Sequence, residues 1–266
     1  MVIDVLMPSY GAPNPQAAFK LATAIDYCRC KCGMYEIERQ IENPEYRPVF
    51  HNLEECPNGK HDVYMHPCIS MAVCHWARNT MVMQRRKNAT HILFVDSDIG
   101  IEPDHIERLL LHDVDIVAGL CTMRVDPAIP NIRMWMEHLQ NYGEIVKWGN
   151  EMLMEVDAVG TGFMLIRNSA LETIAEEYHA EAYRRNGNGW WFENLWLPHI
   201  GGELGEDISF CLKAQRLGIP IYVDTSIQPL HYDYYGYSIP DYLPFQEERI
   251  AGLLAGSQPK PEEISA

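Results

Sequence analysis

Short apolar runs alternate with amphipathic segments along this 266-residue chain, and this alternation limits the folds open to it. The runs Val2–Met7 and His91–Val95 have the length of strands, and segments 16–28 and 103–111 that follow them carry apolar residues at helical spacing. Strands separated by helices are typical of a largely parallel sheet with helices on both faces. We therefore predict an α/β chain whose mostly parallel central sheet is flanked by helices.

Four further segments extend this plan. Residues 69–86 have the pattern of a long helix, and residues 156–166 that of a strand interrupted at Gly160-Thr161-Gly162. Residues 186–205 are rich in glycine and tryptophan and predict a loop, whereas Asp207–Leu217 predicts a helix.

Length predicts one large domain. Domains have about 100–200 residues and single α/β domains often reach about 250, so we expect residues 1–245 to form a single domain. The polar, proline-containing segment 33–60 predicts an insertion within it. Residues 246–266 predict a C-terminal helix or disordered tail.

The net charge of the chain limits the kinds of molecule that it is expected to bind. The chain has 21 Lys and Arg residues against 37 Asp and Glu residues, a formal net charge of −16. This disfavours broad binding to nucleic acid or anionic lipid, although basic clusters at 85–87 and 184–185 leave a short basic groove open. No apolar window of about 18 residues predicts a membrane span, and Met1-Val-Ile-Asp4 lacks the pattern of a secretory leader. We expect a cytoplasmic protein, in the host cytoplasm if a phage encodes it.

The eight cysteines are expected to be reduced in that compartment. Cys28, Cys30 and Cys32 alternate, a spacing that does not let all three face one ion on a helix. A structural metal and local disulfides, either of which Cys56 or Cys68 could join, remain alternatives to incidental thiols.

The strongest chemical signal is Asp96-Ser97-Asp98, directly after the run His91–Val95. On extended backbone, carboxylates at positions i and i+2 point the same way, and here they emerge at the carboxyl end of a central strand, where open α/β sheets bind ligands. Such oxygen ligands suit Mg²⁺ or Mn²⁺, with a substrate diphosphate completing the coordination. The alternative is that both residues serve only as turn and cap residues.

A second signal is Gly205-Glu206-Asp207, at the start of a predicted helix. A helix N-terminus keeps a carboxylate ionised, so Glu206 and Asp207 are candidate catalytic residues, with Asp207 the preferred general base. A plain N-cap remains the alternative for Asp207. His231 follows a later strand and is a candidate metal ligand, or a structural histidine.

Two segments are candidate binding elements. Gly160-Thr161-Gly162 would let backbone approach a sugar closely, or form a bulge in a strand. The string 186–196 and the tyrosine-rich loop after His231 offer flat faces for stacking, so Trp190, Trp191 and Tyr235 are candidate acceptor-binding residues. A loop anchored in the core by its tryptophans is the alternative for the first.

Together these motifs resemble those of nucleotide-sugar glycosyltransferases of the GT-A fold, most nearly the family 2 type of bacteria and phages. The resemblance covers about residues 62–237 and lies in the order of the segments as well as in each one. The matching segments are Ala77-Arg78-Asn79, 90–98, 159–166, 205–211 and the strand that leads to His231.

The resemblance implies a Rossmann-like fold and a role for each matching residue. Asp96 would lie toward the nucleotide ribose and, with Asp98 and His231, toward a divalent metal, Mn²⁺ or Mg²⁺. Asp207, beside Glu206, would activate the acceptor. With the glycine segment included, the predicted donor-binding residues are Pro8, Ser9, Tyr10, Arg78, Asp96, Ser97, Gly160, Thr161 and Gly162.

We therefore expect a hexosyl- or pentosyltransferase that moves a sugar from a nucleoside diphosphate sugar, a UDP-sugar being the expected donor. The expected acceptor is a hydroxyl of a glycan or of a hydroxymethylated DNA base. A nucleotidyltransferase is the second hypothesis, although a basic glycine-rich loop should then follow the first strand, and residues 10–16 contain one glycine and no cation before Lys20. A sugar-binding module without turnover is the third.

Overall fold

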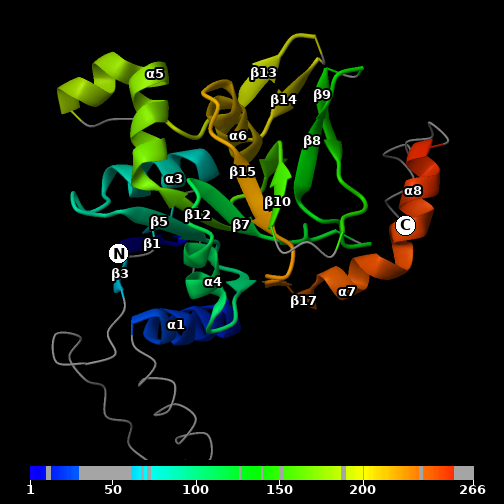
Figure 1. Ribbon diagram of the computed structural model, residues 1–266, viewed down its shortest axis with the longest axis horizontal. Coiled ribbons are helices and arrows are strands. Elements are labelled where there is room, and N and C mark those ends of the chain that lie inside the picture. The colour runs from blue at the N-terminus through cyan, green and yellow to red at the C-terminus, as the bar shows by residue number, and fades with distance from the viewer. Residues whose placement is uncertain are drawn as a thin grey trace, which may run out of the picture.

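A computed structural model describes residues 1–9, 13–29, 61–66, 69–70, 73–125, 127–138, 140–149, 153–186, 190–199, 201–233 and 236–254. Its helices, shown in Figure 1, are α1 (Pro15–Arg29), α3 (Cys74–Met83), α4 (His105–Leu111), α5 (Asn168–Asn186), α6 (Glu206–Arg216), α7 (Ile239–Tyr242), the 3₁₀-helix η2 (Leu243–Phe245) and α8 (Gln246–Leu254). The whole of the predicted insertion 33–60 and residues 255–266 lie outside the described residues.

A seven-stranded sheet forms the centre of the molecule. In spatial order its strands are β10 (Leu153–Val156), β15 (Ile221–Asp224), β7 (Ile116–Gly119), β12 (Phe163–Arg167), β5 (His91–Val95), β1 (Val2–Leu6) and β3 (Asp62–Met65). Five strands run in one direction, whereas β10 and β12 run in the other, because both pair antiparallel with their neighbours. The predicted α/β class with a mostly parallel sheet is confirmed.

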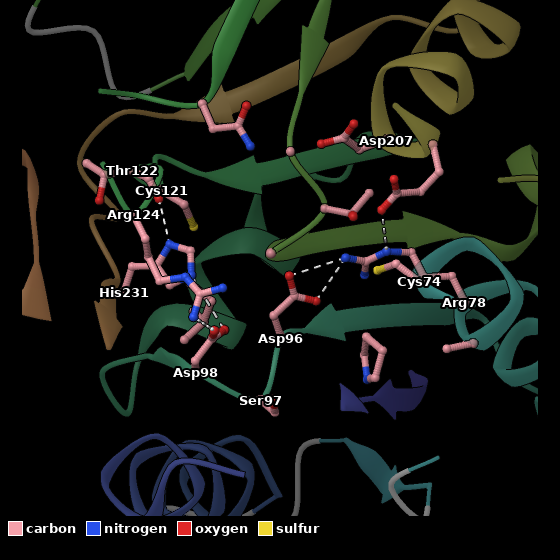
Figure 2. A pocket seen from close by; sticks show the side chains of 18 residues that line it. Cys74, Arg78, Asp96, Ser97, Asp98, Cys121, Thr122, Arg124, Asp207 and His231 are labelled. Carbon is pink, nitrogen blue, oxygen red and sulfur yellow. Dashed lines mark hydrogen bonds and ion pairs between the residues drawn. The ribbon is translucent and has the colours of Figure 1, made fainter. Parts of the chain in front are cut away.

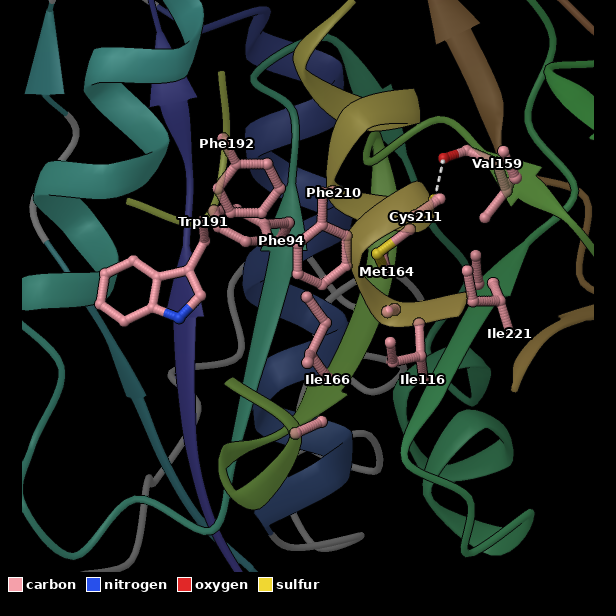
Figure 3. Packing of buried hydrophobic residues seen from close by; sticks show 14 of the residues in the cluster. Phe94, Ile116, Val159, Met164, Ile166, Trp191, Phe192, Phe210, Cys211 and Ile221 are labelled. Atoms are coloured by element: carbon pink, nitrogen blue, oxygen red, sulfur yellow. Dashed lines mark hydrogen bonds between the residues drawn. The ribbon is translucent and has the colours of Figure 1, made fainter. Parts of the chain in front are cut away.

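Helices cover both faces of this sheet (Figure 1), because its strands are apolar on both sides. Along β5, Ile92 and Phe94 face one core together with residues of α3, α5 and α6. Leu93 and Val95 face a second core together with residues of α1 and α4. The first core includes the aromatic stack of Phe192 on Phe210, with ring centroids 4.8 Å apart (Figure 3).

The reversed strand β12 is important for the position of the site. It pairs with β5 from Phe163 opposite Val95, so that the segment before β12 lies beside the segment that follows β5. The Asp96 N–H donates to the Gly162 carbonyl at 2.9 Å and joins these two segments. Two motifs that lie 60 residues apart in sequence thus meet at one edge of the sheet.

Smaller sheets complete the described chain. They are β8 (Ile132–Met136) with β9 (Asn141–Glu144) and β11 (Ala158–Val159), β13 (Leu195–Leu197) with β14 (Gly202–Leu204), β16 (Leu230–Tyr232) with β17 (Gly236–Tyr237) and β6 (Ile99–Gly100), and β2 (Pro8–Ser9) with β4 (Ile69–Ser70). No helix among the residues described is both long and apolar enough to cross a membrane.

Two predicted elements differ from the structure. The helix predicted over 69–86 begins only at Cys74, because Ile69 and Ser70 pair parallel with β2. The loop predicted over 186–205 contains the hairpin of β13 and β14, which leads directly into α6.

Candidate active site

A cavity of about 280 Å³ opens at the edge of the sheet where β5 and β7 end. The N-termini of α3 and α6, the segment before β12 and strand β16 complete its wall (Figure 2). Its lining residues are Pro8, Cys74, Ala77, Arg78, Asp96, Ser97, Asp98, Ile99, Cys121, Thr122, Arg124, Asn131, Gly160, Thr161, Gly162, Glu206, Asp207 and His231.

Arg78 joins two acidic residues of the cavity. Its Nη2 atom lies 3.0 Å from Asp96 Oδ1 and 3.2 Å from Oδ2, and its Nε atom lies 3.5 Å from Glu206 Oε1. The guanidinium is buried over the Phe94 ring. Burial lowers the pKa of Arg78, but Asp96, Cys74 and Glu206 raise it by more, so the group stays charged. Arg78 therefore fixes Asp96 and Glu206 relative to each other.

Asp98 has different partners. Its Oδ2 atom lies 2.9 Å from Nη1 of Arg124, and its Oδ1 atom lies 3.5 Å from Nε2 of His231. Burial raises the pKa of Asp98, but His231 and Arg124 together lower it below its ordinary value. Asp98 is therefore a carboxylate at neutral pH.

The predicted parallel orientation of Asp96 and Asp98 is wrong. Residues 96–98 form a turn instead of continuing the strand, and the Ile99 N–H donates back to the Asp96 carbonyl at 3.0 Å. Each carboxylate thus turns to its own arginine (Figure 2).

The orientation of His231 suits a metal ligand. Strand β16 pairs with β6 and sets His231 opposite Ile99, just after Asp98. The ring atom Nδ1 lies 2.7 Å from the Thr122 carbonyl, which can only accept, so Nδ1 carries a proton. Nε2 then faces Asp98 Oδ1, and a cation between the two atoms would satisfy both.

Asp98 and His231 thus fit a divalent ion as two of its ligands. Among the described residues, no group of three or more His, Cys, Asp or Glu side chains is close enough to hold a metal. Mg²⁺ and Mn²⁺ usually take only one or two protein ligands beside phosphates, with substrate oxygens and water in the other positions.

Asp207 lies in the first turn of α6 at the other end of the cavity. Its Oδ1 atom accepts the Ile208 N–H at 2.8 Å. Burial and the negative charge of Glu206 raise the pKa of Asp207 above its ordinary value, against the opposing effects of the Ile208 N–H and Arg78. A carboxylate whose pKa is raised is a stronger base than an exposed one, as proton abstraction requires.

Several buried polar atoms of the cavity lack a hydrogen-bond partner within the described part of the chain. They are Arg78 Nη1, Thr122 Oγ1 and Thr161 Oγ1. Leaving such a group unpaired costs about 1–3 kcal/mol, so proteins rarely place several together without a ligand or water to satisfy them. These groups therefore need a ligand or water to satisfy them.

Gly160 also has a neighbour within the protein that requires a glycine. A Cβ atom at Gly160 would lie 1.9 Å from Nδ2 of Asn131. Gly160 thus makes room for the side chain of Asn131, which itself lines the cavity. The Thr161 hydroxyl and Gly162 line the cavity as well.

Most of the residues predicted for the site line this one cavity. Of the predicted donor-binding, metal and catalytic residues, these are Pro8, Arg78, Asp96, Ser97, Asp98, Gly160, Thr161, Gly162, Glu206, Asp207 and His231. Tyr10 and Tyr235 lie outside the described residues, and of Ser9 only the backbone, which belongs to β2, is described.

The acceptor role predicted for Trp191 is wrong. Its side chain is 0% exposed, and its indole N–H donates to the Leu171 carbonyl at 2.8 Å in the core. Trp190 is partly exposed and meets the His75 ring edge-on at 6.3 Å, but it does not line the cavity. Trp191 anchors this segment in the core instead, which was the alternative for the segment.

Sequence reasoning missed several lining residues, among them Cys121, Thr122, Arg124 and Asn131. The first three directly follow β7, a predicted strand, so the rule that ligands bind where parallel strands end could have found them. Asn131 follows no such element, and no local signal marks it.

No family model and no curated protein matches this chain. Among solved structures it is similar to A197 from STIV, with 17% identity over 88% of this chain and 86% of that chain and a TM-score of 0.39. It is similar to S. aureus TarS 1-349 in complex with UDP-GlcNAc, with 15% identity over 89% of this chain and 58% of that chain and a TM-score of 0.41. A third is GalNAc-T7 with UDP, GalNAc and Mn²⁺, with 10% identity over 84% of this chain, 42% of that chain and a TM-score of 0.45.

Proposed function

We propose that this chain is a metal-dependent glycosyltransferase that moves a sugar from a nucleoside diphosphate sugar, preferably a UDP-sugar, to an acceptor hydroxyl. The observation that carries the proposal is the cavity itself. Unpartnered buried polar atoms, a carboxylate–histidine pair suited to a cation and a carboxylate of raised pKa line the same 280 Å³ space. The unpartnered atoms match sugar hydroxyls, and the carboxylate–histidine pair matches a diphosphate with its cation. The carboxylate of raised pKa matches the acceptor proton.

Each group has one task in the proposed reaction. Asp98 and His231 would hold a divalent ion, and the ion would supply Lewis-acid chemistry that neutralises the leaving diphosphate. Asp207 accepts the proton of the acceptor hydroxyl as its oxygen bonds to the anomeric carbon. The bond from that carbon to the diphosphate breaks, and the nucleoside diphosphate leaves with the electron pair. This single displacement inverts the anomeric configuration.

The remaining groups position the reactants. Arg78 pairs with both Asp96 and Glu206 and fixes their positions. In this proposal Asp96 faces the nucleotide and Glu206 faces the acceptor. The Thr122 and Thr161 hydroxyls have no hydrogen-bond partner among the described residues, and we assign them to sugar hydroxyls. Holding both substrates in line supplies a large part of the rate enhancement.

A nucleotidyltransferase fits the cavity less well. That reaction needs cations for a triphosphate, and Lys20, the first cation after the loop that follows β1, pairs with Glu102 away from the cavity. The acceptor we propose is a glycan hydroxyl or that of a hydroxymethylated DNA base. Oligosaccharide and DNA acceptors are to be compared directly.

Donor binding tests the proposal at its first step. Binding stabilises a protein by about 2.7 kcal/mol at a ligand concentration 100-fold above Kd. We expect one nucleoside diphosphate sugar of a panel to raise the melting temperature by several degrees with Mn²⁺ present, and to do so far less with chelator. The variant Asp98→Ala should lose this shift and Asp104→Ala, on α4 outside the cavity, should keep it. No shift with any donor would contradict the proposal.

The pH dependence of transfer tests the base. Only the ionised form of Asp207 accepts a proton, and its pKa is raised above the ordinary 3.8. As pH falls, kcat/KM should therefore decline around a midpoint above 3.8, and rise to a plateau at higher pH. Measured from pH 4 to 8, the low residual rate of Asp207→Asn should lack this acid limb. An unchanged limb in that variant would assign it to another group.

A further inference from the structure

Arg124 is the second arginine of the cavity, and it is held differently from Arg78. Its side chain is 46% exposed, whereas that of Arg78 is 4% exposed. It follows β7 and reaches Asp98 Oδ2 at 2.9 Å from the rim (Figure 2). A half-exposed ion pair of this kind contributes little to stability, so its guanidinium can leave at small cost.

Asp98 has a partner on each oxygen. Oδ1 faces Nε2 of His231 at 3.5 Å, and Oδ2 is covered by the guanidinium of Arg124. A divalent ion held by Asp98 and His231 would lie within a few ångströms of that guanidinium. Two positive charges so close repel each other, by an amount that partial exposure reduces but does not abolish.

We infer that Arg124 is an exchangeable counter-charge for Asp98: its guanidinium competes with the divalent ion for the Asp98 carboxylate. The inference rests on the proposed function, because that function supplies the metal. Arg78 holds Asp96 in a buried pair and takes no part in this exchange. Arg124 thereby sets the metal concentration at which the cavity loads, and it prevents Asp98 from being an uncompensated charge before loading.

Mn²⁺ binding without nucleotide tests this inference directly. Free Mn²⁺ is measured by its electron paramagnetic resonance signal during titration of the full chain. Arg124→Ala should bind Mn²⁺ about tenfold more tightly than the wild type, since a repelling charge is removed. Arg124→Lys keeps the charge and should remain near wild type. Arg167→Ala, which removes one charge from the opposite end of β12, is the matched control and should not differ from wild type.

Two outcomes decide whether Arg124 competes with the ion. The gain in Arg124→Ala should vanish when Asp98→Asn is added, which separates this site from other acidic residues of the chain. Unchanged or weaker Mn²⁺ binding in Arg124→Ala would overturn the inference and make Arg124 a support for Asp98. A transfer assay on the same samples tests the proposed function separately, because the affinity gain does not require turnover and transfer does not require the gain. Melting curves confirm that each variant is folded.

Discussion

Asp207→Asn is expected to lower the rate of sugar transfer by roughly 10²–10⁴-fold and to leave donor binding intact. The asparagine keeps the shape of the side chain and an oxygen that can accept the Ile208 N–H, now bonded at 2.8 Å. It cannot accept a proton from the acceptor. The loss should therefore fall on kcat, with the donor-induced rise in melting temperature preserved.

Asp104→Asn is the matched control for this experiment. Asp104 also lies at the start of a helix, α4, but outside the cavity. It should transfer sugar at the wild-type rate. A wild-type rate in Asp207→Asn would reduce Asp207 to a helix-capping residue, and a product of retained configuration would remove its role as base.

The chemistry of the cavity was predictable where it follows from the ends of strands. Asp96 and Asp98 follow an apolar strand, and Glu206 and Asp207 begin a helix. Their positions at the ends of these elements could therefore be predicted from the sequence alone. His231 could be predicted as a site residue only because it comes after the other motifs in the order that the resembling family shows. These local signals account for most of the lining residues that were predicted.

The direction of β12 was not predictable from its apolar pattern, which is the same for a parallel and an antiparallel strand. Its pairing with β5 sets Gly162 against Asp96, and no residue of either strand encodes that choice by itself. The partners of Asp98 depend in the same way on distant segments. Arg124 comes from the end of β7 and His231 from β16, and only the folded chain brings them together.

The tryptophan string shows how composition can mislead. Glycines beside aromatic residues are typical of a mobile binding loop, yet Asn79 fixes this segment to α3. The backbone N–H groups of Trp191 and Phe192 donate to Asn79 Oδ1 at 2.8 and 3.1 Å, and Asn79 Nδ2 donates to the Phe192 carbonyl at 2.7 Å. These bonds turn the indole inward (Figure 3), which no local pattern reveals.

Trp191→Ala is therefore expected to destabilise the fold by about 3–5 kcal/mol, the usual cost of removing a fully buried large aromatic side chain. The side chain is 0% exposed, and its loss also deprives the Leu171 carbonyl of the indole N–H donor at 2.8 Å. Urea unfolding measures the change in stability. The substitution leaves the residues that line the cavity unchanged, so donor binding should persist at urea concentrations below the unfolding transition.

Trp196→Ala provides the matched comparison, because Trp196 lies on β13 in the same region and is 60% exposed. Surface substitutions usually change stability by no more than about 0.5 kcal/mol, so this variant should unfold close to the wild type. Wild-type stability in Trp191→Ala, combined with a selective loss of acceptor use, would instead restore Trp191 to the acceptor site. The complete burial of the indole makes the first result the expected one, because Trp191 packs in the same core as α6, the helix that places Asp207 at the cavity.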